Sequence, residues 1–71
     1  MKLPRDISGT EAVRALERLG FSVIRQAGSH IRLAQGDRRV TVPTHRNLVV
    51  GTLQSILRQA GVSLDDFQNA L

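Results

Sequence analysis

Two glycine-containing dipeptides constrain this chain more than any other feature, because they divide one β-prone stretch into three short segments. Residues 21–43 are rich in Val, Ile and Thr, and the stretch is interrupted by Gly28-Ser29 and again by Gly36-Asp37. A two-residue loop that contains glycine is a common connection in a tight β-hairpin. The sequence therefore predicts a three-stranded antiparallel meander.

Pairing across these turns separates the side chains into an apolar face and a basic face, because side chains alternate along a strand. On the apolar face, the register pairs Leu33 with Val40. On the basic face, it pairs Arg25 with Arg32, and two facing like charges repel each other unless an anion lies between them. His30, at the start of the second strand, joins the basic face.

The first strand has a register that the pattern leaves open. Regular pairing places Ile24 opposite Leu33, but it then puts Phe21 on the basic face. We therefore expect the strand either to begin after Phe21 or to carry a β-bulge.

Helical patterns flank the meander on both sides. Ser8 and Glu11 have the spacing of a capping box, and the helix that they begin is expected to end at about Leu19. Apolar residues recur at helical spacing over residues 49–60 and predict a second helix. Ser63 is a good N-cap for a last short helix.

The order helix, three antiparallel strands, helix predicts an α+β fold, α-β-β-β-α. Its three-stranded antiparallel sheet would be covered by helices on one face and open to solvent on the other. The chain has 71 residues and no cysteine, so we expect a single domain over residues 1–71, without disulfides, in the cytoplasm. No apolar run approaches the roughly 18 residues that span a bilayer, so no membrane segment is expected.

The charge balance favours a polyanionic partner. Lys and Arg total 10 against 6 for Asp and Glu, which gives a formal charge of +4, and such a balance is typical of proteins that bind nucleic acid. Half of these cations fall in the predicted sheet or the loop after it: Arg25, Arg32, Arg38, Arg39 and Arg46. A solvated face with no binding role would show the same arrangement, so charge alone leaves both interpretations open.

His30 is the residue with the most promising chemistry. It follows the Gly28-Ser29 turn, and Arg32 lies two residues along on the same face. An imidazole can take a proton from a ribose 2′-hydroxyl or give one to a leaving oxygen. A lone histidine at the start of a strand is nevertheless more often an ordinary surface residue, so spacing alone does not make it catalytic.

The sequence gives little evidence for a role of the second histidine or for any other class of reaction. His45 follows Pro43, which is expected to pair with His30, so it either approaches His30 or is an ordinary loop residue. Neither histidine sits in a metal-binding pattern, and we expect no metal site. The sequence has no phosphate-binding glycine loop and no nucleophile elbow, so no small-molecule cofactor is expected.

Three blocks of the sequence resemble, in order, the toxins of the HicA family. The first block runs from Arg25 to Leu33 and contains Gly28-Ser29-His30, which matches the family's catalytic signature. The others are residues 40–45 and residues 51–61, and Leu19-Gly20-Phe21 precedes them all. The resemblance covers nearly the whole chain.

This resemblance implies a fold like that of double-stranded-RNA-binding domains. It implies the toxin of a type II toxin–antitoxin system, an endoribonuclease that cleaves messenger RNA without a metal, and a HicB-type antitoxin as partner. His30 would be the catalytic residue. The residues expected to shape the site or contact RNA are Gly28, Ser29, Arg25, Arg32, Arg39, His45 and Arg46.

Two other functions fit the same residues. One is a non-catalytic RNA-binding module of the same fold, in which His30 is incidental. The other is an interaction protein whose basic face docks on an acidic partner. The chain also lacks a lysine cluster at the start of its second helix, so recognition of a long RNA duplex is not expected.

Overall fold

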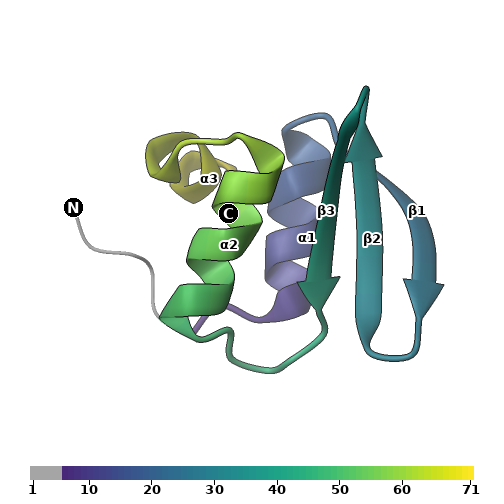
Figure 1. The fold of residues 1–71 in the computed structure, drawn as a ribbon. Coiled ribbons are helices and arrows are strands. Elements are labelled where there is room, and N and C mark those ends of the chain that lie inside the picture. Colours follow the sequence, from purple (N-terminus) through teal and green to yellow (C-terminus); the bar gives the residue numbers. More distant parts are fainter. Residues whose placement is uncertain (1–5) are drawn as a thin grey trace.

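The computed structural model describes residues 6–71, and residues 1–5 of the predicted single domain lie outside the described part. The three strands form one antiparallel sheet in the order β1-β2-β3. The helices form a second layer on one side of it (Figure 1). The predicted α+β fold is confirmed, and a third helix completes it. The elements are α1 (Gly9–Arg18), β1 (Ser22–Ala27), β2 (His30–Gln35), β3 (Arg38–Pro43), α2 (Val50–Ala60) and α3 (Leu64–Ala70).

Both predicted turns connect the strands as tight hairpins. Gly28 and Gly36 have φ values of 58° and 56°, and each is the first residue of a two-residue loop. A positive φ at this position is what a type II′ turn requires, and glycine adopts it without steric strain. The tight turns fix the pairing of Ala27 with His30 and of Gln35 with Arg38.

The first strand carries a β-bulge at Ile24. Val23 pairs with Leu33, and the register shifts between Val23 and Arg25. The prediction that Ile24 lies opposite Leu33 is therefore wrong, while the alternative of a bulge in a strand that begins after Phe21 is confirmed. The physical reason is burial, because Phe21 is only 3% exposed in the core whereas Ile24 remains 53% exposed.

The capping box begins α1 as the sequence predicts. The Ser8 Oγ accepts a hydrogen bond from the Glu11 N–H at 3.0 Å, and the Glu11 Oε1 accepts one from the Ser8 N–H at 3.1 Å. The helix ends at Leu19, its C-cap, and Gly20 follows with a φ of 99°. Within residues 6–71, no helix is long and apolar enough to cross a membrane.

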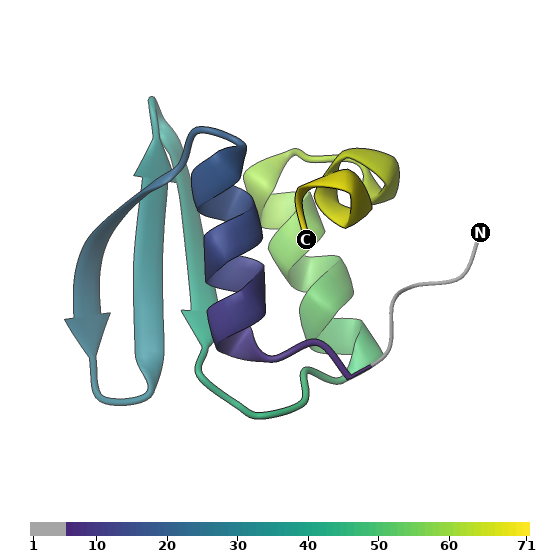
Figure 2. The ribbon, with the colours of Figure 1, turned by 180° about the vertical axis from the view of Figure 1, so that it is seen from behind.

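A single hydrophobic core lies between the sheet and the helices. Figure 2 shows α1 in front of the sheet, with α2 and α3 beside it. Among the described residues, no polar or charged residue is buried, so the polar side chains of the sheet all stay outside the core. The largest fully buried side chains are Phe67, Leu16, Leu33, Leu53, Ile56, Val40 and Val42.

The loop between β3 and α2 is bound to two other segments at the same end of the fold, the β1–β2 turn and the start of α1 (Figure 1). The Thr44 N–H donates to the Ser29 carbonyl oxygen at 2.7 Å, and the Gly9 N–H donates to the His45 carbonyl oxygen at 2.9 Å. Gly9 lies so close to this loop that an added Cβ would meet the Pro43 carbonyl oxygen and lie 2.8 Å from the Thr44 Cα. The start of α1 therefore packs directly on the backbone of the loop.

Replacing this glycine should reverse the usual effect of alanine in a helix. Gly9→Ala should lower the free energy of unfolding by about 1–3 kcal/mol, because the new methyl group presses on backbone that cannot move aside cheaply. Gly51→Ala is the matched control, because a Cβ at Gly51 meets no atom within 4 Å. It should raise the free energy of unfolding by up to about 1 kcal/mol. Urea unfolding of both variants checks this, and a stabilised Gly9→Ala protein would contradict the packing.

Candidate functional site

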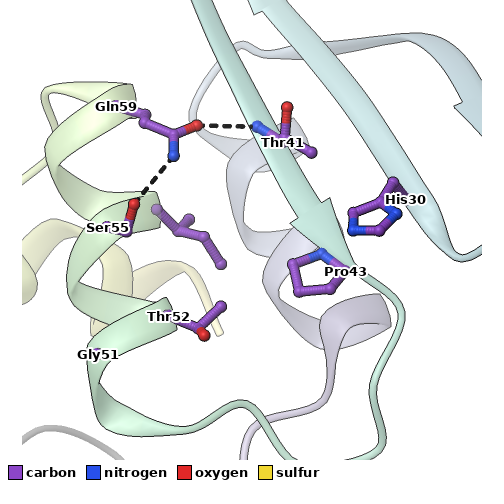
Figure 3. A pocket seen from close by; sticks show the side chains of 8 residues that line it. His30, Thr41, Pro43, Gly51, Thr52, Ser55 and Gln59 are labelled. Carbon is purple, nitrogen blue, oxygen red and sulfur yellow. Dashed lines mark hydrogen bonds between the residues drawn. The ribbon is translucent and has the colours of Figure 1, made fainter.

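His30 begins β2 on the face of the sheet that the helices leave open. It pairs with Ala27 on one side and with Pro43 on the other, and its ring lies beside Pro43 (Figure 3). The residue is exposed. Among residues 6–71, no hydrogen bond or ion pair engages its ring nitrogens. Both ring nitrogens are therefore available to a ligand.

Two adjoining hollows meet at His30. The smaller one, of about 170 Å³, lies over the sheet, and we call it the arginine hollow; it is lined by Arg25, Ala27, His30, Arg32 and Thr41. The larger one, of about 360 Å³, lies between β3 and α2 (Figure 3), and we call it the helix-side hollow. Its lining consists of His30, Thr41, Pro43, Gly51, Thr52, Ser55, Ile56 and Gln59.

The arginine hollow is electrostatically suited to an anion. Arg25 and Arg32 face each other across the β1–β2 pair, as the sequence predicts. Between Ser22 and Gly61 the chain has six arginines and a single acidic residue, Asp37. Like charges placed opposite each other on neighbouring strands repel, and a phosphate between them would remove this repulsion.

Arg39 lies on the same face but is held apart from His30. It pairs with Ala34, farther along the sheet, and it lines neither hollow. Its guanidinium donates to the carbonyl oxygens of Gly36 at 2.8 Å and Arg38 at 2.9 Å. The structure therefore places Arg39 beside the β2–β3 turn and not with Arg25 and Arg32.

His45 and Arg46 also lie outside the two hollows. Both are exposed in the loop after β3, and neither belongs to the lining of a hollow that contains His30. In the described part of the chain, His45 makes a hydrogen bond through its backbone carbonyl, which accepts from the Gly9 N–H. The structure does not bring the two imidazoles together in one hollow.

Gly28 and Ser29 contribute through their backbone. Gly28 adopts the positive φ of the turn, and a Cβ there would meet no atom within 4 Å. The Ser29 carbonyl oxygen accepts two hydrogen bonds from Thr44, from its N–H at 2.7 Å and from its Oγ1 at 3.0 Å. The turn that precedes His30 is thereby fixed to the loop that follows β3. Thr44 is part of this arrangement and is not predicted from the sequence.

The residues that α2 contributes to the site are also not predicted from the sequence. Thr52, Ser55 and Gln59 recur at spacings of three and four residues, so they share one side of the helix. This polar stripe is visible in the sequence, but its neighbour in the fold is not. Only the three-dimensional structure shows that the stripe faces His30 across the helix-side hollow.

Gln59 joins α2 to the outer edge of β3. Its side-chain Oε1 accepts a hydrogen bond from the Thr41 N–H at 3.0 Å, and its Nε2 donates to the Ser55 Oγ at 3.0 Å (Figure 3). An edge strand otherwise leaves such N–H groups without a protein partner. The contact holds the helical wall of the hollow against the strand.

Comparison with known protein families finds a match. The family described as HicA toxin of bacterial toxin-antitoxin matches residues 9–62, which include every residue that lines the two hollows. A comparison with curated proteins finds no match. Within residues 6–71, no three side chains of His, Cys, Asp or Glu come together in a way that could hold a metal ion.

Removing one of the facing arginines should stabilise the fold at low salt. Arg32→Gln relieves the repulsion by Arg25 and should raise the free energy of unfolding by up to about 1 kcal/mol. The gain should fade as salt screens the two charges. Urea unfolding at low and at high sodium chloride concentration measures it. A loss of stability at low salt would show that the two guanidinium groups do not repel each other in the free protein.

Proposed function

Because the chain belongs to the HicA family of toxins from bacterial toxin–antitoxin pairs, we propose that it is the toxin of a type II pair and cleaves messenger RNA as an endoribonuclease. The observation that carries this proposal is the position of His30, exposed where the arginine hollow meets the helix-side hollow. An unbound imidazole beside two arginines combines a group that moves protons with groups that bind phosphate.

In the proposed reaction, His30 is the general base. A neutral ring nitrogen takes the proton of a ribose 2′-hydroxyl, and the 2′-oxygen attacks the adjacent phosphorus. The new O2′–P bond forms as the bond from phosphorus to the 5′-oxygen breaks, and the leaving oxygen takes a proton from water. The products are a 2′,3′-cyclic phosphate and a 5′-hydroxyl, and the RNA itself supplies the nucleophile, so no metal is needed.

The arginines are proposed to stabilise the charge that develops on the phosphate. Arg25 and Arg32 line the hollow that contains His30, and positively charged donors already in place stabilise a transition state without reorganisation. Gly28 and Ser29 fix the start of β2, which orients the imidazole. Three exposed residues outside the hollows are proposed as outer contacts to the RNA backbone: Arg39, His45 and Arg46.

The same basic surface is proposed to receive the antitoxin. Arg25 and Arg32 line this surface and Arg39 lies on the same face of the sheet, and such a cationic surface favours an acidic partner by charge complementarity. A HicB-type antitoxin that covers both hollows would exclude RNA from His30 and keep the toxin inactive. The cytoplasm, where messenger RNA is translated, is the proposed place of action.

One observation favours a second candidate, a non-catalytic RNA-binding module. Among residues 6–71, no hydrogen bond orients the His30 ring, whereas a general base is commonly oriented by a further group. In this alternative the arginines bind the RNA backbone and His30 performs no chemistry. The two candidates differ in what the loss of the imidazole does.

His30→Ala should abolish cleavage without abolishing binding. The rate of single-turnover cleavage should fall about 10²–10⁴-fold, the usual contribution of a positioned general base. RNA affinity should stay within a few-fold, because Arg25 and Arg32 remain. His45→Ala is the matched control and should slow cleavage only a few-fold, because His45 lines neither hollow. Cleavage at the parent rate by His30→Ala would contradict the assignment, and binding without any cleavage by the parent protein would favour the binding module.

The two facing arginines should account for part of the salt dependence of RNA binding. Arg25→Gln and Arg32→Gln should each weaken binding and reduce the slope of log affinity against log salt by about 0.7–0.9, the value for one lost phosphate contact. Arg14→Gln, on the exposed surface of α1, should leave the slope unchanged. Fluorescence anisotropy over a salt series measures all three variants. The same slope in every variant would show that the arginine hollow is not part of the RNA site.

A further inference from the structure

The helix-side hollow differs in chemistry from the arginine hollow that it adjoins. Apart from His30, its lining contains no ionisable side chain. Thr52 and Ser55 contribute hydroxyl groups, Gln59 contributes an amide, and Pro43 lies across from Thr52 (Figure 3). A phosphate would find no arginine here. The hollow suits an uncharged group that has apolar faces and a hydrogen-bonding edge.

The lining and volume of the hollow agree with such a ligand. Ile56, which is only 1% exposed, also lines it and provides an apolar floor. Thr52 and Ser55 are half-buried, so a bound group would be partly enclosed. The volume of about 360 Å³ is within the range of small-molecule sites, roughly 300–1,000 Å³.

The Gln59 amide is fixed in one orientation. Its Oε1 accepts from the Thr41 N–H, and because a backbone N–H can only donate, the amide oxygen must face the strand. The amide group has two hydrogens, and one of them is directed to the Ser55 Oγ. The other hydrogen remains a donor near the Ser55 hydroxyl group.

The chain has no exposed Phe, Tyr or Trp ring on which an RNA base could stack. It contains two phenylalanines and neither tryptophan nor tyrosine. Phe21 and Phe67 are 3% and 0% exposed, so neither reaches a ligand. Proteins that bind single-stranded RNA usually hold bases on aromatic side chains. A site with an apolar floor and hydrogen-bonding groups is another way to hold a base near His30.

We propose that the helix-side hollow binds the nucleobase of the nucleotide whose 2′-hydroxyl meets His30. This inference rests on the proposed function. His30 and Thr41 line both hollows, so one nucleotide seated there extends its phosphate toward Arg25 and Arg32. Its base then lies between β3 and α2. The hollow makes the protein selective for the base on the 5′ side of the cut.

The test uses four DNA oligonucleotides that each contain one ribonucleotide, so that only one bond has the 2′-hydroxyl needed for cleavage. The four differ only in the base of that ribonucleotide. The parent protein should cleave the best and the worst at rates that differ at least about tenfold, as one or two base-edge hydrogen bonds provide. Thr52→Val and Ser55→Ala should reduce this spread to within about threefold.

Two control variants separate base selection from general effects. Gln54→Ala changes an exposed residue of α2 that does not line the hollow, and it should keep the full spread. Arg32→Gln should slow all four reactions by a similar factor and also keep the spread. Equal cleavage of the four oligonucleotides by the parent protein, or a spread that survives both Thr52→Val and Ser55→Ala, would overturn the proposal.

A binding measurement keeps the inference separate from catalysis. The four nucleoside 3′-monophosphates are titrated into the His30→Ala protein while the backbone amide signals of Thr52 and Ser55 are followed by NMR. Shifts at both amides that depend on the base are expected, and Gly51→Leu should abolish them. This variant narrows the hollow at a position where an added Cβ meets no atom within 4 Å. Absence of shifts at these amides would overturn the base site, whereas shifts without RNA cleavage by the parent would overturn only the nuclease.

Discussion

The alternation of side chains along β2 and β3 is the constraint on which the rest of this molecule depends. Leu33 and Val40 are fully buried, and each such side chain stabilises the fold by about 1.5–3 kcal/mol. With these residues facing the helices, His30 and Arg32 must face the opposite side, and a slip of one residue would reverse both sets. Holding Arg32 opposite Arg25 costs up to about 1 kcal/mol, less than the burial of one aliphatic residue contributes. The core therefore maintains a charged surface that would not assemble by itself.

Two sets of hydrogen bonds fix the segments that border this open face and form the sides of the two hollows. The Ser29 carbonyl, bound twice by Thr44, fixes the turn before His30 to the loop after β3. Gln59, bound to the Thr41 N–H, brings α2 to the outer edge of the sheet. The first contact limits the motion of the residue that would perform the chemistry. The second provides a neutral surface next to a cationic one, so that a single nucleotide can contact both.

Local patterns in the sequence are sufficient for much of this fold. The two tight glycine turns and the capping box of α1 each depend on a few neighbouring residues. The turn at Gly28 also places Arg25 and His30 on one face of the sheet. The predicted register of β1 is wrong at Ile24 because the bulge results from burial of Phe21, which is a tertiary effect. The contribution of Gln59 is not predicted because no local pattern tells which strand edge a helix borders. The proposal that His30 is catalytic rests on the family resemblance, since its spacing alone is equally typical of an ordinary surface histidine.

Both the proposed cleavage and the proposed base site require one nucleotide to bind at His30 with its phosphate between the two facing arginines. The most direct test is a crystal structure of the protein with a short RNA in which fluorine replaces the 2′-hydroxyl at the cleaved position, so that the RNA binds and cannot react. We expect a phosphate between Arg25 and Arg32. The fluorine, standing in for the hydroxyl oxygen, should lie about 3 Å from a ring nitrogen of His30, within the reach of a general base. RNA bound on the α1 and α3 side of the molecule, with both hollows empty, would contradict this mode of binding.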